Sequence, residues 1–264
     1  PLWGYRSMVY SAMSIGFLSF IVWAHHMYLT GMGTKVATFF QTTTMMISIP
    51  SVIILTALFI SLWGGSIRFN SASLFALSFL PMFGIGGLTG LPLGFNASDI
   101  FLHDSYYVIG HFHYVVAPGT MFAVFAGIYY WFPKITGRHM NELLGKLHWA
   151  GSIFFMNCVF APMFIQGFKG MSRRMSDGGT TYFGKDVGVG ADPGVLGLNN
   201  MILWCAVGLG ISQIPFIINF FSSIFIGKHA TSDNPWQATT LDWATPTPPP
   251  HGNFLQEPVV YRGP

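Results

Sequence analysis

Long apolar runs recur along the whole chain and are separated by short polar segments. A helix that crosses a bilayer needs about 20 predominantly apolar residues. Six stretches meet that requirement, and they cover residues 8–25, 37–62, 71–92, 106–132, 147–168 and 196–226. The pattern therefore predicts an all-α, polytopic bundle of six transmembrane helices.

Composition supports the same class of protein. The chain is 52% hydrophobic and only 8% charged, whereas soluble globular domains carry about 25% charged residues. The apolar runs continue to the sixth span, so they do not reflect a signal peptide. The net charge of +3 is spread along the chain without a basic patch, so a lipid membrane is the expected environment and nucleic acid is not an expected partner.

Six spans place both ends of the chain on one side of the membrane. The positions expected on that side are Arg6, Arg68, Lys134, Arg138, Lys146, Lys228 and Arg262. The positions expected on the other side are Lys35, Lys169, Arg173, Arg174 and Lys185. This weak excess predicts that both ends lie in the cytoplasm or the mitochondrial matrix. It also places the loops at 93–105 and 169–195 together on the outer side, with the turn after His25-His26.

His111-Phe112-His113 leads into the fourth apolar run. Imidazoles beside a membrane segment are costly to bury without a partner. On a helix, positions i and i+2 point about 200° apart. One helix can therefore hold two separate metal centres on its two sides, a geometry suited to electron transfer between two hemes.

His25-His26 ends the first apolar run. Neutral imidazole is a preferred ligand of copper. Adjacent residues on a regular helix differ by about 100°, so two rings on one ion predict a helix end or a local distortion. The alternative is a polar feature of the membrane edge, and two ligands alone do not complete a copper site.

His103-Asp104 lies in the loop before the His111 helix. An imidazole beside a carboxylate can help to bind a hard divalent ion, with water at other positions. The alternative is that Asp104 caps the following helix, because acidic residues favour the first helical turn.

Arg173 and Arg174 lie in the outer loop after the fifth span. Paired guanidinium groups suit bidentate recognition of carboxylates, including the propionates of heme. The alternative is a solvated charge pair with Asp177. The remaining histidines are expected in or near loops without a ligand role, and they are His139, His148, His229 and His251.

Taken together, these motifs closely resemble the C-terminal half of subunit I of the heme-copper cytochrome oxidases of the aa3-like type. The strings that carry the resemblance are Ile21–Met27, Gly87–Gly90, His103–Tyr114, Gly170–Arg174 and Pro248–Phe254. The resemblance runs over essentially the whole chain. It implies that residues 1–228 form half of a twelve-helix fold and that residues 229–264 form an extended, Pro-rich tail on the inner side.

The resemblance also implies residue roles. His25 and His26 would be two of three ligands of the copper called CuB. His111 would be the axial ligand of the high-spin heme that faces this copper, and His113 would be one of two axial ligands of the low-spin heme. Phe112 would lie between the two hemes, which are expected to be of the a type.

At the outer side, His103 and Asp104 would help to bind magnesium, with a carboxylate from subunit II completing the site. Arg173 and Arg174 would pair with heme propionates. Each role follows from the match of this chain to the family's strings.

The family reduces dioxygen to water, with electrons from outside and protons from inside, and couples this to proton translocation. Partners implied are the N-terminal half of subunit I, a subunit II with a copper centre, subunit III, and cytochrome c or quinol. The expected location is the bacterial plasma membrane, with the mitochondrial inner membrane as the alternative. A quinol oxidase, a nitric oxide reductase and a non-catalytic homologue are the competing functions.

Two departures from the family pattern affect these expectations. Ile54 stands four residues after Pro50, where the family commonly has a lysine of one proton uptake path, so Ser51 and Thr56 or another route would have to serve. The third CuB histidine, its tyrosine and the second low-spin ligand belong to the family's upstream half. The chain is therefore expected to be a fragment or one part of a split subunit, active only with that half.

Overall fold

The computed structural model describes residues 2–180, 193–254 and 258. Within them, six helical segments are long and apolar enough to cross a membrane, which confirms the predicted all-α bundle. They are Tyr5–Thr30, Thr34–Leu62, Ser71–Gly94, Tyr106–Thr136, Glu142–Phe168 and Gly194–Ile226.

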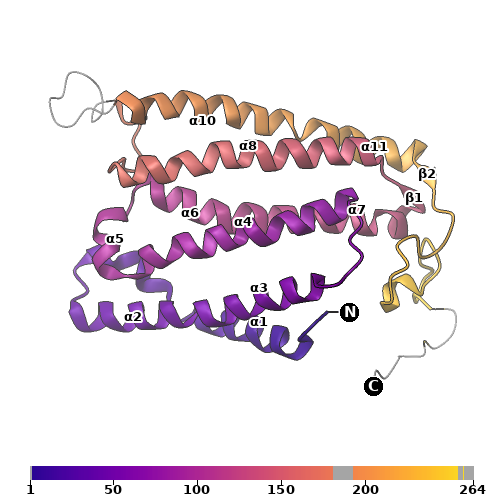
Figure 1. Ribbon diagram of the computed structural model, residues 1–264, viewed down its shortest axis with the longest axis horizontal. Coiled ribbons are helices and arrows are strands. Elements are labelled where there is room, and N and C mark those ends of the chain that lie inside the picture. The colour runs from indigo at the N-terminus through magenta and orange to yellow at the C-terminus, as the bar shows by residue number, and fades with distance from the viewer. Residues whose placement is uncertain (1, 181–192, 255–257, 259–264) are drawn as a thin grey trace.

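The spans run roughly parallel to the long axis of the molecule (Figure 1). The first three contain α1 (Tyr5–Ser19), η1 (Trp23–Thr30), α2 (Thr34–Met46), α3 (Ser48–Leu62) and α4 (Ser71–Gly94). The short α5 (Asn96–Leu102) leads to the fourth span, which contains α6 (Tyr106–Val116), η2 (Ala117–Phe122) and α7 (Ala123–Thr136). The last two contain α8 (Glu142–Phe168), α10 (Pro193–Ile211) and α11 (Ile214–Ile226).

Helix α8 packs between α10 and α6, whereas α4 packs against α6 and α7, and α1 packs against α3. The predicted outer end carries η1, α5 and the loop after α8, on the left of Figure 1. The inner end carries the short antiparallel pair β1 (Arg138–His139) and β2 (Lys228–His229) and the C-terminal tail with η3 (Leu241–Trp243).

Prolines explain where three spans are interrupted. A proline has no N–H to donate to the carbonyl four residues earlier, so a regular helix is disturbed there. Pro50 and Pro215 stand four residues after Met46 and Ile211, the last residues of α2 and α10. Pro118 stands at the start of the π-helical turn η2 in the fourth span. The imidazole pair His111 and His113 therefore lies just outside an irregular turn of its helix.

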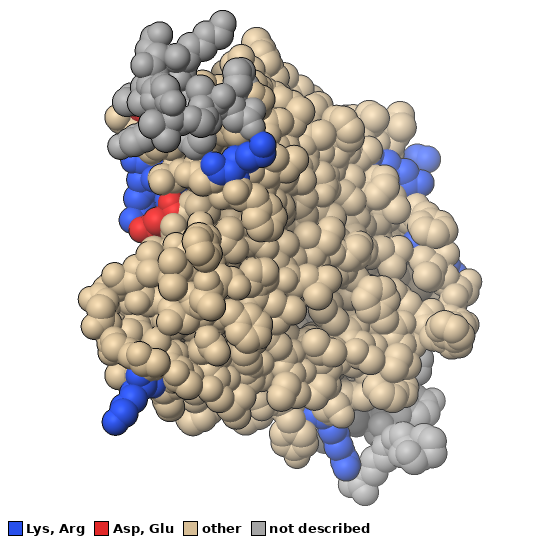
Figure 2. All heavy atoms as spheres, turned by 60° about the vertical axis from the view of Figure 1, so that its left-hand side comes forward, with Lys and Arg blue, Asp and Glu red and all other residues tan. Residues whose placement is uncertain are grey.

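The flanks of the bundle expose large apolar side chains, as expected of surfaces that face lipid. Phe17, Phe20, Phe168 and Phe225 are each more than 60% exposed. In Figure 2, lysine, arginine and acidic residues are sparse on the visible face and leave broad uncharged areas between them. The exposure pattern agrees with an integral membrane protein.

His148 corrects one prediction from the sequence. It does not lie in a loop but is fully buried in α8, because the helix begins at Glu142 rather than near residue 147. Its Nε2–H donates to Gln213 Oε1 at 3.0 Å, and Nδ1 accepts from the Tyr129 hydroxyl at 3.2 Å. Both ring nitrogens of this neutral imidazole are satisfied within the protein.

The C-terminal tail folds back onto the inner end of α7. Lys134 is only 4% exposed, and its Nζ donates to Asp233 O at 2.8 Å, to Thr245 O at 2.7 Å and to Thr247 Oγ1 at 2.9 Å. The same ammonium lies 5.1 Å from the centre of the Trp243 ring. Lys134 therefore forms hydrogen bonds to three oxygens from two separate parts of the tail.

Aromatic side chains of α7 hold the tail as well. Trp131 Nε1 donates to Asp242 Oδ2 at 2.8 Å, and Tyr130 O accepts from Trp236 Nε1 at 2.9 Å. Burial would raise the pKa of Asp242, but hydrogen bonds from Thr240 and Trp131 outweigh this effect and lower it. Asp242 is therefore suited to remain an ionised acceptor at neutral pH.

Replacement of Lys134 by methionine should loosen the tail. Three buried or half-buried oxygens would lose a charged donor, at a cost of roughly 2 to 4 kcal/mol. Limited proteolysis of the purified complex should then cleave within residues 230–254 faster than in the unmodified protein. Lys146→Met is the matched control, because Lys146 is exposed. Equal cleavage rates for Lys134→Met and the control would show that Lys134 does not hold the tail.

Candidate metal centre

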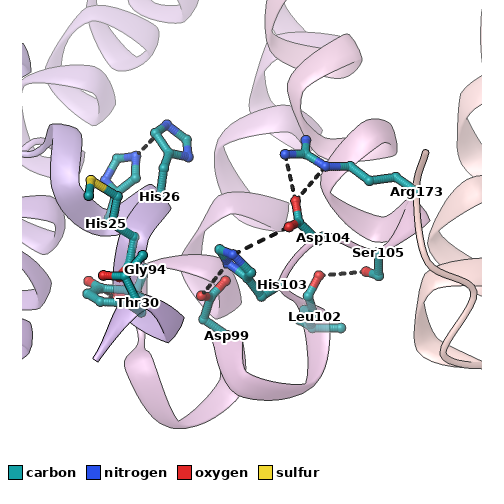
Figure 3. Close-up of polar contacts among 12 residues, drawn as sticks. His25, His26, Thr30, Gly94, Asp99, Leu102, His103, Asp104, Ser105 and Arg173 are labelled. Carbon is teal, nitrogen blue, oxygen red and sulfur yellow. Dashed lines mark hydrogen bonds and ion pairs between the residues drawn. The ribbon is translucent and has the colours of Figure 1, made fainter. Parts of the chain in front are cut away.

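His25 and His26 lie in η1, a 3-10 turn that follows the end of α1. Their Nε2 atoms are 3.1 Å apart (Figure 3). Two imidazole nitrogens bound to one ion at about 2.0–2.1 Å are themselves roughly 3 Å apart. The backbone leaves helical geometry at the next residue, Met27, which has φ −126°. The local departure from a regular α-helix that the adjacent histidines predicted is present in this segment.

The protonation of His25 follows from its contact with α2. Its Nδ1 lies 3.0 Å from Thr44 Oγ1. The Thr44 hydroxyl uses its only proton to donate to Phe40 O at 2.5 Å, so it can only accept from His25. Nδ1 therefore carries the proton, and Nε2 keeps its lone pair, which is the form of imidazole that binds a metal.

His111 is held by α4. Its Nδ1 donates to Gly86 O at 2.9 Å, which leaves the lone pair on Nε2. A Cβ atom at Gly90 would lie only 2.7 Å from His111 Cε1, closer than packed carbon atoms approach. Gly90 therefore provides the space in which the His111 ring sits.

Helix α4 also contacts the segment that carries the paired histidines. The hydroxyl of the buried Tyr28, in η1, donates to Gly94 O at 3.0 Å. The outer half of α4 thus joins the His25-His26 pair to His111.

His113 faces a different neighbour. Its Nδ1 donates to Ile109 O at 2.9 Å in its own helix, which again leaves Nε2 unprotonated. The ring stacks on Phe160 of α8, with centroids 4.1 Å apart and planes 11° apart. His111 contacts α4 and His113 contacts α8, in agreement with the opposite directions expected of positions i and i+2.

A second cluster forms at the outer end from α5, the loop to α6 and the loop after α8 (Figure 3). His103 Nδ1 lies 3.1 Å from Asp99 Oδ2, and His103 Nε2 lies 3.7 Å from Asp104 Oδ2. Arg173 Nε and Nη2 each lie 2.7 Å from Asp104 Oδ1. Arg174 is more exposed and lies 3.9 Å from the same oxygen.

Asp104 does not cap α6. Ser105 is the N-cap residue, and its Oγ accepts from Tyr107 N at 3.3 Å. Asp104 adopts a left-handed φ of 52°, which is uncommon outside glycine, and it turns its carboxylate toward Arg173. The capping alternative is therefore wrong, and the carboxylate takes part in the outer cluster.

Asp99 belongs to this cluster although the sequence analysis did not select it. It is 3% exposed, and burial raises the pKa of its carboxyl group, while His103 acts in the opposite direction. The available signal was its spacing: Asp99 lies in α5 and His103, four residues later, is the C-cap of that helix, and side chains four residues apart on a helix are neighbours.

The described residues present two pairs of side chains that could bind a metal ion. Within residues 2–180, 193–254 and 258, no group of three or more histidine, cysteine or acidic side chains is arranged to hold an ion. His25 and His26 supply two converging donors, and His103 and Asp104 supply two more. Neither pair alone completes a metal site within the described residues.

The helix that carries His111 and His113 packs closely on α8. A Cβ atom at Gly167 would lie 2.1 Å from Tyr107 N. A Cβ atom at Gly110 would lie 3.2 Å from Phe160 O. These two glycines allow α6 and α8 to approach closely, which determines what the His113 ring can contact.

Comparison with known proteins identifies the family. The family model described as "Cytochrome C and Quinol oxidase polypeptide I" matches residues 1–205. The chain belongs to this family. Heme and copper are the cofactors of heme-copper oxidases in general, and imidazoles bonded to the protein through Nδ1, as in His25, His111 and His113, suit such groups.

Three curated relatives are bacterial proteins. The chain is 46% identical over its full length to cytochrome c oxidase subunit 1 of Synechocystis sp., of which it covers 45%. It is 41% identical to the subunit of the same name from Thermostichus vulcanus, again covering 45%, and 42% identical to an alternative cytochrome c oxidase subunit 1 of Bradyrhizobium diazoefficiens, covering 43%. The chain spans less than half the length of these relatives and corresponds to their C-terminal half.

A solved structure supports the fold. A heme-copper terminal oxidase dimer determined by cryo-EM matches with a TM-score of 0.71 at 20% identity, over 87% of this chain and 44% of the other. At this identity the match shows the fold alone. The six-helix arrangement is thus half of a larger known architecture, as the sequence predicted.

Gly167→Ala tests the contact between α6 and α8. Its added methyl group would collide with the backbone of Tyr107, and overpacking of this kind costs about 1–3 kcal/mol. The thermal midpoint of the purified complex should fall by several degrees. Gly197→Ala in α10 is the control, since its Cβ would have no neighbour within 4 Å. If both variants melt alike, the close approach at Gly167 does not limit stability.

Proposed function

We propose that this chain is the C-terminal half of the catalytic subunit of a terminal oxidase that reduces dioxygen to water. Electrons would come from cytochrome c through the copper centre of subunit II, and the reaction would be coupled to proton translocation. The observation that carries the proposal is the shared state of His25, His111 and His113. Each uses Nδ1–H to bond a protein oxygen and keeps Nε2 for a metal.

Residue roles follow from these positions. His25 and His26 would hold CuB through their converging Nε2 atoms. His111 would be the axial ligand of the high-spin heme, and His113 would be an axial ligand of the low-spin heme. When bound, the two hemes and the copper supply one-electron transfer and the reduction of oxygen. The chain fixes the direction of each ligand and separates the two heme ligands by one residue, Phe112.

The outer cluster would bind magnesium and anchor the hemes. His103 and Asp104 would hold the ion together with a carboxylate from subunit II. Arg173 and Arg174 would pair with heme propionates. The guanidinium of Arg173 forms an ion pair with Asp104. Arg174 is the more exposed of the two arginines, so it has more surface available for a propionate.

Proton uptake would not depend on a lysine in α3. Ile54 stands at the expected position, and the Ser51 hydroxyl donates to Ile47 O at 2.9 Å within the helix. A path past Ile54 would therefore need water. We propose that uptake follows a route outside α3.

The proposed assembly contains the N-terminal half of subunit I, subunit II and subunit III, in the bacterial plasma membrane. The bacterial relatives support this location, and the hemes are proposed to be of the a type. A quinol oxidase is the alternative, because the family description covers both donors. A non-catalytic homologue is disfavoured, since it has no need of three imidazoles with free Nε2 atoms.

The decisive experiment is metal analysis and optical spectroscopy of the complex purified with the polypeptide that supplies the N-terminal half. The expected result is two hemes, one of which binds carbon monoxide, and one copper beyond any in subunit II. A single heme, or no additional copper, would contradict the proposal. Iron in place of that copper would instead indicate a nitric oxide reductase.

The position of His111 predicts a specific effect of Gly90→Ala. The new methyl group would displace the imidazole, because its carbon would lie 2.7 Å from Cε1. The complex should lose most of its carbon monoxide-binding heme while it retains the low-spin heme. Gly87→Ala on the same helix is the control, since nothing lies within 4 Å of its Cβ position. An unchanged carbon monoxide difference spectrum in Gly90→Ala would argue against His111 as the high-spin ligand.

A further inference from the structure

The contact between His113 and Phe160 has a geometry that constrains the imidazole. The two rings are stacked 4.1 Å apart at 11°. Phe160 belongs to α8, whereas His113 belongs to α6, so the stacking joins two helices. Phe160 is half-buried. Rotation of the His113 ring out of its plane would drive its edge into the phenyl ring.

A second restraint comes from the ligand helix itself. His113 Nδ1 donates to Ile109 O at 2.9 Å. This bond holds one edge of the ring, and the phenyl ring of Phe160 limits how far the ring can turn about that edge. Phe112 adds a third contact, with centroids 4.2 Å apart and planes 31° apart.

The packing of α6 on α8 keeps Phe160 in place. A Cβ at Gly110, one turn before His113, would lie 3.2 Å from Phe160 O and 3.1 Å from Phe164 Cε1. Tyr114 fixes the same region, because its hydroxyl donates to Asn157 Oδ1 of α8 at 2.7 Å. These contacts hold the α8 backbone that carries Phe160 close to α6.

We infer that Phe160 is a positioning residue that sets the plane of the His113 imidazole and, through it, the electronic state of the low-spin heme. The inference rests on the proposed role of His113 as a ligand of that heme. Groups that contact a ligand orient it and tune the metal. The orientation of an axial imidazole plane changes its overlap with the iron d orbitals, so it changes both the magnetic spectrum and the reduction potential.

The test uses Phe160→Leu, Phe160→Ala and Phe160→Tyr in the complete oxidase complex. Phe160→Leu and Phe160→Ala remove the stacked ring, whereas Phe160→Tyr retains it. Phe154→Leu is the control, because Phe154 lies on the same helix and is 60% exposed. The readouts are the largest g value of the oxidised low-spin heme by electron paramagnetic resonance and its midpoint potential.

Both readouts should shift in Phe160→Leu and Phe160→Ala beyond the spread between the unmodified complex and Phe154→Leu. Phe160→Tyr should restore the unmodified values. The inference is overturned if the Phe160→Leu complex keeps its full low-spin heme content with unchanged g value and potential, even where Phe160→Ala fails to assemble. It is also overturned if Phe160→Tyr shifts the readouts as far as Phe160→Leu.

His113→Leu separates this inference from the proposed function. It should remove the low-spin heme signal while the carbon monoxide-binding heme remains. A low-spin heme that persists in His113→Leu would refute the role of His113. Loss of that signal in His113→Leu, together with unchanged spectra in Phe160→Leu, would refute only the positioning role of Phe160.

Discussion

The hydrogen bond from Nδ1–H to a protein oxygen is the interaction on which the candidate centre depends. His25 uses the Thr44 hydroxyl, His111 uses the Gly86 carbonyl and His113 uses the Ile109 carbonyl. Each bond fixes one tautomer and aims the opposite nitrogen away from the scaffold. A neutral imidazole within a membrane protein is thus both satisfied and prepared for a metal.

These acceptors act only if the helices that carry them are correctly placed relative to the histidines. Gly86 and Gly94 put carbonyls of α4 within reach of His111 and Tyr28, so a single helix positions both His111 and the turn that carries His25 and His26. By contrast, His148 is buried with both nitrogens bonded to protein. His148 therefore has no nitrogen left to bind a metal ion.

Much of this organisation could be predicted from the sequence, because apolar length and histidine spacing are local properties. The six spans, the opposite directions of His111 and His113, and the distortion at His25-His26 followed from these alone. The capping role considered for Asp104 was wrong because Ser105 competes for the same amides. Gly90 and Phe160 were missed because their roles arise from contacts between helices that are distant in the sequence. Asp99 was missed although its spacing of four residues from His103 was a readable signal. His148 was misplaced because a polar first turn hid the true start of α8.

The π-helical turn at Ala117–Phe122 changes which faces of the fourth span, Tyr106–Thr136, line up with each other. A π turn accommodates one more residue than an α turn, and one residue corresponds to about 100° of rotation. The two halves of the fourth span are therefore out of phase, and a single helical wheel drawn through it misassigns the faces of one half. In the outer half, His111 and His113 point toward α4 and α8. In the inner half, Tyr129 contacts His148 and Lys134 contacts the tail. The contacts of His111 and His113 and the contacts of the tail therefore lie on separate sides of the π-helical turn.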